Sequence, residues 1–138
     1  MISPFHLAIP VTDLKASALF YGEHVGCGQG RSSKQWIDWD FYGHQLVTHL
    51  VDRMPQGEAA NQVDNKSVPV PHFGLVLPKA DWEALALRLE QAGYNFHIAP
   101  YIRFQGEVGE QGTFFLFDPS GNALEFKYFE DMTQLFAS

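Results

Sequence analysis

The chain has 138 residues, 46% of them hydrophobic, and a formal net charge of −7 from nine basic and sixteen acidic side chains. A chain of this length and apolar content can bury the core of one domain, which argues against a disordered protein. The acidic balance argues against a nucleic-acid-binding protein, because binding phosphates requires clustered Lys and Arg.

The cellular location is indicated by what the sequence lacks. A single cysteine, Cys27, cannot form an intrachain disulfide, as expected in the reducing cytoplasm. Residues 1–6 lack the basic region and long apolar run of a signal peptide. The sequence contains no run of about 18 apolar residues, so no membrane span is predicted. We therefore expect a cytoplasmic protein with no membrane partner.

The first half of the chain predicts a strand, a helix and then strands. Residues 5–11 are short and apolar, with a proline near the end, which is typical of a strand. A Thr-Asp pair then supplies candidate helix caps, and apolar residues recur at helical spacing until Gly26. Residues 36–41 and 45–51 alternate in polarity around a turn, which predicts a pair of strands.

Residues 52–69 are rich in polar side chains, Gly and Asn, and have few large apolar groups. This composition predicts a linker between the halves, or a mobile lid.

The second half repeats the order of the first. Residues 70–77 predict a strand, and a helix then begins near Pro78 and ends at Gly93. Three further strands are expected at residues 94–99, 113–117 and 122–128, with an Asp-Pro-Ser-Gly turn before the last. The sequence therefore predicts an α+β fold of two tandem βαβββ modules, 1–51 and 70–138, within one domain spanning 1–138.

Side chains that bind metals occupy matching places in the two halves. His6 and His72 each begin the first strand of a half, and His49 and Glu125 lie in later strands. A repeat that places such residues at equivalent points can gather them into one metal site. Because a carboxylate buried without a partner is costly, Glu125 is expected to have a cation beside it.

The sequence resembles the vicinal oxygen chelate superfamily, which includes glyoxalases, extradiol dioxygenases, and bleomycin- and fosfomycin-resistance proteins. The resemblance covers nearly the whole chain and is most specific in residues 117–126, Phe-Asp-Pro-Ser-Gly-Asn-Ala-Leu-Glu-Phe. The segments Phe5-His6-Leu7-Ala8, Gly43-His44-Gln45-Leu46-Val47 and Pro71-His72-Phe73-Gly74 resemble a bacterial group described as predicted extradiol-type dioxygenases. The resemblance implies paired modules forming a cup-shaped, open sheet barrel around one divalent metal. It also implies a homodimer.

Two histidines and one carboxylate, here His6, His72 and Glu125, are the ligand set of non-haem Fe(II) oxygenases. Fe(II) is therefore the expected metal, with Mn, Ni or Zn as alternatives. If His49 also binds, the site becomes more like that of glyoxalase, in which the metal acts as a Lewis acid. His49 could instead be an acid–base group, and the sequence leaves this open.

Further candidate catalytic residues are Arg103 and Tyr101. Arg103 lies among apolar residues and could bind a carboxylate or enolate of the substrate, or an acidic neighbour in the protein. Tyr101 could donate a hydrogen bond to the substrate or belong to the core. Characterised extradiol dioxygenases have a Tyr shortly before the Asp-Pro turn, and the corresponding residue here is Phe115.

These observations predict a metal-dependent dioxygenase of the extradiol type, acting with O2 on a small, catechol-like chelating substrate. One alternative is a glyoxalase-like, metal-dependent lyase or isomerase. The other is a non-catalytic protein that binds a small molecule, as in antibiotic resistance.

Overall fold

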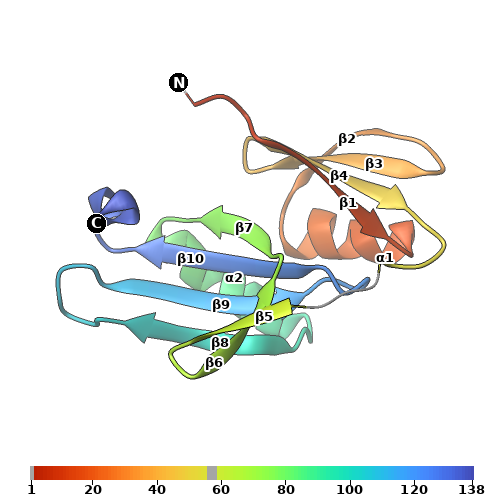
Figure 1. The fold of residues 1–138 in the computed structure, drawn as a ribbon. Coiled ribbons are helices and arrows are strands. Elements are labelled where there is room, and N and C mark those ends of the chain that lie inside the picture. The colour runs from red at the N-terminus through yellow and green to blue at the C-terminus, as the bar shows by residue number, and fades with distance from the viewer. Residues whose placement is uncertain (1, 56–58) are drawn as a thin grey trace. The chain divides into compact units, whose positions relative to one another are not determined.

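The structure is a computed structural model that describes residues 2–55 and 59–138, and these divide into two compact units. The first unit comprises residues 2–55 and 118–122, and the second comprises residues 59–117 and 123–138. Each unit contains a four-stranded sheet with helical structure packed on it (Figure 1). The α+β class and the βαβββ order predicted for each half are confirmed.

The first unit begins with a strand, continues through one helical segment, and ends in three strands. Its elements are β1 (His6–Val11), α1 (Leu14–Ala18), the π-helical turn η1 (Leu19–His24), β2 (Gly28–Ser32), β3 (Trp36–Phe41) and β4 (His44–Leu50). The strands follow the order β1-β4-β3-β2, and β1 runs parallel to β4.

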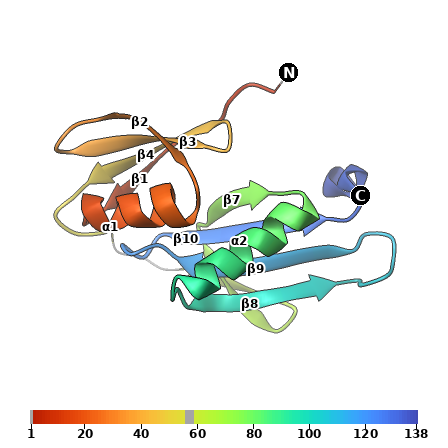
Figure 2. The ribbon, with the colours of Figure 1, turned by 180° about the vertical axis from the view of Figure 1, so that it is seen from behind.

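The helix of the first unit covers one face of this sheet (Figure 2). Asp13 caps the helix, because its Oδ1 accepts a hydrogen bond from the N–H of Ala16 at 3.0 Å. Tyr21 is fully buried, and its ring lies 6.4 Å from that of Trp39 on β3. The indole N–H of Trp39 donates to the hydroxyl of Thr48 at 3.2 Å, which satisfies both buried polar groups.

The Asp-Pro-Ser-Gly turn belongs to this first unit by its contacts. The carboxylate of Asp118 accepts a hydrogen bond from the hydroxyl of Tyr21 at 2.6 Å, and two more from the backbone N–H groups of Ser120 and Asn122. The side-chain amide of Asn122 donates to the carbonyl of Pro10 at 2.8 Å. The turn in which the family resemblance is most specific therefore makes structural contacts within this unit.

The second unit contains a two-stranded hairpin as well as its four-stranded sheet. Its elements are β5 (Ala59–Val63), β6 (Lys66–Val70), β7 (Phe73–Val76), α2 (Lys79–Gln91), β8 (Phe96–Arg103), β9 (Gln111–Phe117), β10 (Ala123–Phe129) and the 3-10 helix η2 (Met132–Phe136). The strands of the larger sheet follow the order β7-β10-β9-β8, and β7 runs parallel to β10.

Helix α2 packs on one face of the larger sheet through buried Trp82, Leu85 and Leu89. The indole N–H of Trp82 donates to the carbonyl of Phe126 at 2.8 Å. The ring of Phe126 faces the helix, because it lies 5.5 Å from the ring of Phe114, which in turn lies 5.7 Å from the ring of Trp82. Since side chains alternate along a strand, the neighbours of Phe126 in sequence point to the opposite face. That opposite face carries the candidate site. No helix in the described part of the chain is long and apolar enough to cross a membrane.

An irregular linker was predicted for residues 52–69, but the hairpin β5–β6 occupies much of this range. Residues 56–58 of the predicted linker lie outside the described residues. It turns at Asp64 and Asn65, whose φ angles of +51° and +61° are those of the tight turn that matches strand twist. The hairpin crosses β8 and β9 on one side of the sheet in Figure 1, and α2 lies on the other side in Figure 2.

Candidate metal centre

His72 and Glu125 lie together on the sheet face opposite α2. Glu125 is in β10, paired with Gly74 of β7, and His72 immediately precedes β7. The Nε2 atom of His72 is 3.2 Å from Oε1 of Glu125, and the two side chains are 28% and 16% exposed. Two of the predicted ligands are therefore in contact and partly accessible.

The hydrogen bond on the other side of the His72 ring determines which nitrogen carries a proton. Nδ1 lies 2.7 Å from the carbonyl oxygen of Pro69, and because a carbonyl only accepts, Nδ1 must be the donor. In the neutral imidazole, Nε2 then directs a lone pair at Glu125, and a proton or a metal ion between them removes the repulsion. Ligand distances of about 2.0–2.2 Å place adjacent donors about 3.0–3.4 Å apart, so the pair fits a divalent metal.

Two neighbours hold this pair in place. The hydroxyl of Thr113 donates to Oε2 of Glu125 at 2.5 Å, which leaves Oε1 directed at His72. The ring of Phe115 meets the ring of His72 edge-on, with centroids 5.0 Å apart. Such partners fix the orientation and basicity of metal ligands. Sequence reasoning did not single out Thr113, although it alternates with Phe115 on the strand paired with β10.

His6 is held in the same manner within the first unit. Its Nδ1 is 2.8 Å from the side-chain oxygen of Gln45, the residue paired with it on β4. When Nδ1 donates to that oxygen, Nε2 presents a lone pair. The side chain lies on the sheet face that points away from α1.

The position of His49 differs from the one inferred from the sequence repeat. The register pairs Ala8 with Val47 and Gly74 with Glu125. If His6 corresponds to His72, then Ala8 corresponds to Gly74, and Val47 rather than His49 corresponds to Glu125. The two positions differ because register depends on strand pairing, which sequence spacing alone does not define. His49 is exposed and lies beside Pro10 and Trp36.

Within residues 2–55 and 59–138, no three His, Cys, Asp or Glu side chains form a group able to hold a metal. Of the four predicted ligands, the structure brings together His72 and Glu125. His6 and His49 belong to the first unit, where they lie on the same sheet face four residues apart in register.

Arg103 and Tyr101 share an acidic partner. The sequence allowed an acidic neighbour for Arg103 but did not identify which residue it is. Nε of Arg103 is 2.8 Å from Oδ2 of Asp64, and the hydroxyl of Tyr101 donates to the same oxygen at 3.0 Å. Burial, followed by the hydrogen bond to Asp64, raises the pKa of Tyr101 above its ordinary value. Tyr101 therefore stays protonated and able to donate.

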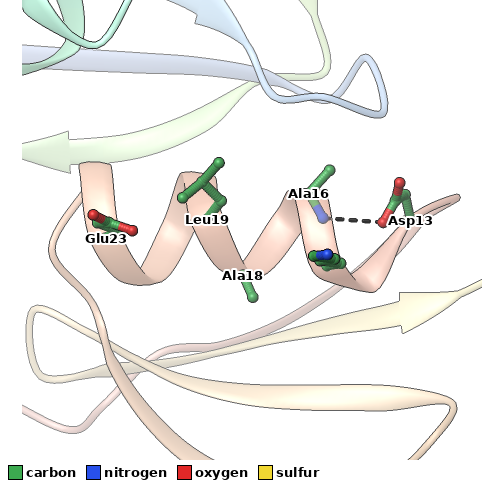
Figure 3. Close-up of a pocket in the computed structure, with 6 residues that line it drawn as sticks. Asp13, Ala16, Ala18, Leu19 and Glu23 are labelled. Carbon is green, nitrogen blue, oxygen red and sulfur yellow. Dashed lines mark hydrogen bonds between the residues drawn. The ribbon is translucent and has the colours of Figure 1, made fainter.

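An open hollow of about 520 Å³ runs along the helical segment of the first unit (Figure 3). It is lined by Asp13, Lys15, Ala16, Ala18, Leu19 and Glu23. The carboxylate of Asp13 is already used as the helix cap, and no histidine lines the hollow. Its chemistry does not match a metal centre.

Two βαβββ units, each with the first and last strands parallel and side by side, define a glyoxalase-type fold. The chain belongs to the glyoxalase/bleomycin resistance protein/dioxygenase superfamily, whose family model matches residues 3–126. The family predicted from the sequence motifs is therefore confirmed.

Three relatives illustrate the range of this superfamily. A crystal structure of a glyoxalase/bleomycin resistance protein/dioxygenase from Alicyclobacillus acidocaldarius is 37% identical, with a TM-score of 0.78 over 97% of this chain and 96% of that one. Glutathione transferase FosA from Serratia marcescens is 26% identical over 120 residues, which are 87% of this chain and 76% of the relative. Lactoylglutathione lyase from Agrobacterium tumefaciens is 17% identical, with a TM-score of 0.68 over 99% and 98% of the two chains, and so shows the fold alone.

Proposed function

We propose that the protein is a metal-dependent enzyme that binds a small substrate through two vicinal oxygen atoms. His72, Glu125 and His6 are the proposed ligands of a divalent metal. The observation that supports this most directly is the contact of His72 with Glu125, in which Nδ1 of the imidazole and Oε2 of the carboxylate are already occupied by protein groups. The remaining donor atoms, Nε2 and Oε1, face each other at a separation suited to one metal ion.

Two neutral imidazoles and one carboxylate suit Fe(II), and they also accept Mn, Ni or Zn. When bound, the metal supplies Lewis-acid polarisation of the substrate oxygens and, if it is iron, redox chemistry with O2. The protein orients the donors through Thr113 and Pro69, and the Phe115 ring packs edge-on against the ring of His72.

The reaction we propose is extradiol-type cleavage of a catechol-like ring by O2. The two-histidine, one-carboxylate ligand set and the sequence motifs around His6 and His72 support it. Arg103 and Tyr101 are proposed to contact the substrate, because the strand register puts them on the same sheet face as Glu125. His49 is proposed as an acid–base group rather than a fourth ligand, because Val47 is the residue that corresponds to Glu125.

A glyoxalase-like lyase or isomerase reaction is the second candidate. It is supported by Phe115, which puts an aromatic ring without a hydroxyl beside His72. In this case Ni, Zn or Mn would act purely as a Lewis acid. A role in binding alone, as in some resistance proteins, would not explain why His72 and Glu125 are paired.

An anaerobic titration of metal-free protein with Fe(II), followed by O2-electrode traces with a panel of catechols, tests the proposal. We expect one equivalent of metal to bind and O2 uptake to depend on substrate. The Glu125→Gln variant should lose metal binding, and His24→Gln, which changes a histidine outside the proposed ligand set, should retain it.

Metal binding without O2 uptake would select the second candidate, to be assayed with hemithioacetals and Ni, Zn or Mn. Absence of metal binding by the unmodified protein would overturn both. We also propose that the protein forms a homodimer, and sedimentation of the same samples tests this.

A further inference from the structure

The tip of the β5–β6 hairpin places one carboxylate on two hydrogen-bond donors of β8. Asp64 accepts from Arg103 at 2.8 Å and from the Tyr101 hydroxyl at 3.0 Å. Lys66, two residues further along the hairpin, holds its ammonium 4.2 Å from the centre of the Tyr101 ring. The cluster therefore contains two cations, one phenol and one carboxylate.

This cluster lies on the same sheet face as the His72–Glu125 pair. Tyr101 is paired with Thr113 across β8 and β9, and the Thr113 hydroxyl donates to Glu125. The charge of Glu125 contributes to the raised pKa of Tyr101, although less than burial and the Asp64 contact. Tyr101 and Glu125 are two strands and two residues apart, which places their backbones about 12 Å from each other. A small molecule bound between the two side chains would span this distance.

The contact between Asp64 and Arg103 is suited to exchange. The two side chains are 38% and 31% exposed, so solvent screens the pair and it stabilises the fold by no more than about 1 kcal/mol. The guanidinium is the side chain best shaped to bind a carboxylate, and the Tyr101 hydroxyl adds a neutral donor. A carboxylate from a ligand would thus meet the same donors that Asp64 uses.

We propose that Asp64 occupies the place of a substrate carboxylate, and that the substrate is a carboxylic acid carrying vicinal oxygens. On binding, the carboxylate of the substrate replaces that of Asp64 on Arg103 and Tyr101, and its vicinal oxygens reach towards His72 and Glu125. Lys66 adds a second positive charge beside the same position. This substrate class rests on the proposed function, but the carboxylate position can be tested without any metal.

The test is an NMR titration of metal-free protein with benzoate, a carboxylate without vicinal oxygens, and with benzamide, its neutral counterpart. We expect benzoate to bind at Arg103 and benzamide not to bind. Asp64→Asn removes the competing charge and should tighten benzoate binding about two- to fivefold, the range that corresponds to an exposed ion pair. Arg103→Gln should weaken it at least about tenfold, and Arg103→Lys should have an intermediate effect because it keeps the charge but loses the fork. Arg88→Gln is the matched control, since it removes a cation from α2 on the other side of the sheet.

Equal binding of benzoate and benzamide would overturn the proposal, as would an equal loss in the Arg88 and Arg103 variants or unchanged binding in Asp64→Asn. Circular dichroism of each variant shows whether it is folded. If Arg103→Gln does not fold, the affinity of Arg103→Lys for benzoate is compared with that of the unmodified protein instead. The metal titration described above is independent of these results. A failure to bind metal with benzoate binding intact would reject the metal proposal alone, and the reverse would reject the carboxylate position alone.

Discussion

A methyl group on Gly74 would lie 1.6 Å from the backbone oxygen of Glu125 and 2.6 Å from its carbonyl carbon. No side chain can therefore be accommodated at residue 74 while β7 and β10 stay paired. The close approach of these strands also brings His72, two residues before Gly74, to the carboxylate of Glu125. The glycine thus links the local strand geometry to the candidate metal centre.

We expect Gly74→Ala to separate β7 from β10 and to destabilise the protein by about 2–4 kcal/mol, because backbone atoms cannot move aside as a flexible side chain would. Affinity for Zn(II) should fall together with stability, since the separation of His72 and Glu125 changes. Urea unfolding and a chelator competition assay measure the two effects.

The control for this substitution is Gly28→Ala, at the start of β2. A methyl group there would meet the β-carbon of Asp40 at 3.6 Å, which is an ordinary contact. Its effect on stability should stay within about 0.5 kcal/mol. If both variants behaved alike, the close approach at Gly74 would not be the cause.

The hydroxyl of Thr113 is the next group we expect to control metal affinity. Thr113→Val keeps the shape of this buried side chain but removes the donor to Oε2 of Glu125. Losing a partner of a ligand commonly reduces metal affinity about 10- to 100-fold, and we expect a loss in this range. Thr113→Ser keeps the hydroxyl and should restore most of the affinity. Equal Zn(II) affinities for the Val and Ser variants would contradict this role.

The parts of the fold predicted from the sequence are those with a clear apolar pattern. Residues 36–41 alternate between apolar and polar side chains, and residues 113–117 are almost continuously apolar. Both segments form strands. By contrast, β2 (Gly28–Ser32) is polar and each of its residues is exposed, so its pairing with β3 left no periodic signal. The β5–β6 hairpin was also missed, because its five-residue strands contain few large apolar groups.

The sequence pattern identified two residues of the candidate site, but it did not define strand register or the hairpin. Alternation and the repeat identified His72 and Glu125, which the structure brings into contact. The repeat could not define register, so His49 was matched with Glu125 although Val47 is the corresponding residue. The contact of Arg103 with Asp64 depends on a hairpin that the sequence did not predict, and so this partner could not be identified.

The buried hydrogen bond from Tyr21 to Asp118 should contribute strongly to stability. Burial, with the charge of Asp118 next, raises the pKa of Tyr21 well above its ordinary value, so the phenol stays protonated and donates at 2.6 Å. Tyr21→Phe removes this donor to a carboxylate and should cost about 1.5–3 kcal/mol in urea unfolding. Tyr42→Phe, which removes a donor to the neutral carbonyl of Val25, should cost only about 1 kcal/mol. Equal losses would mean that the charge of Asp118 contributes nothing.

The thiol of Cys27 should be unreactive in the folded protein. Burial, with a smaller contribution from the charge of Asp40, raises its pKa from the ordinary 9.0 to about 12. Only the thiolate reacts with iodoacetamide, and at pH 9 it makes up about half of the unfolded thiol but about one part in a thousand of the folded thiol. We expect alkylation at pH 9 to be at least about a hundredfold slower in buffer than in concentrated urea, measured by mass spectrometry. Comparable rates would show that the thiol is accessible.

The same pKa shift predicts how stability changes in alkali. Between pH 9.0 and about 12, the folded thiol keeps a proton that the unfolded thiol has lost, so the folded state binds more protons. The contribution of Cys27 is therefore complete below pH 9 and decreases as pH rises, by up to about 1.4 kcal/mol per pH unit. Cys27→Ala removes this titration and should show a shallower decline between pH 9 and 11, although Tyr21 and Tyr128 still contribute because their pKa values are also raised. Urea unfolding at several pH values measures both slopes, and parallel curves for the two proteins would exclude a buried, protonated thiol at residue 27.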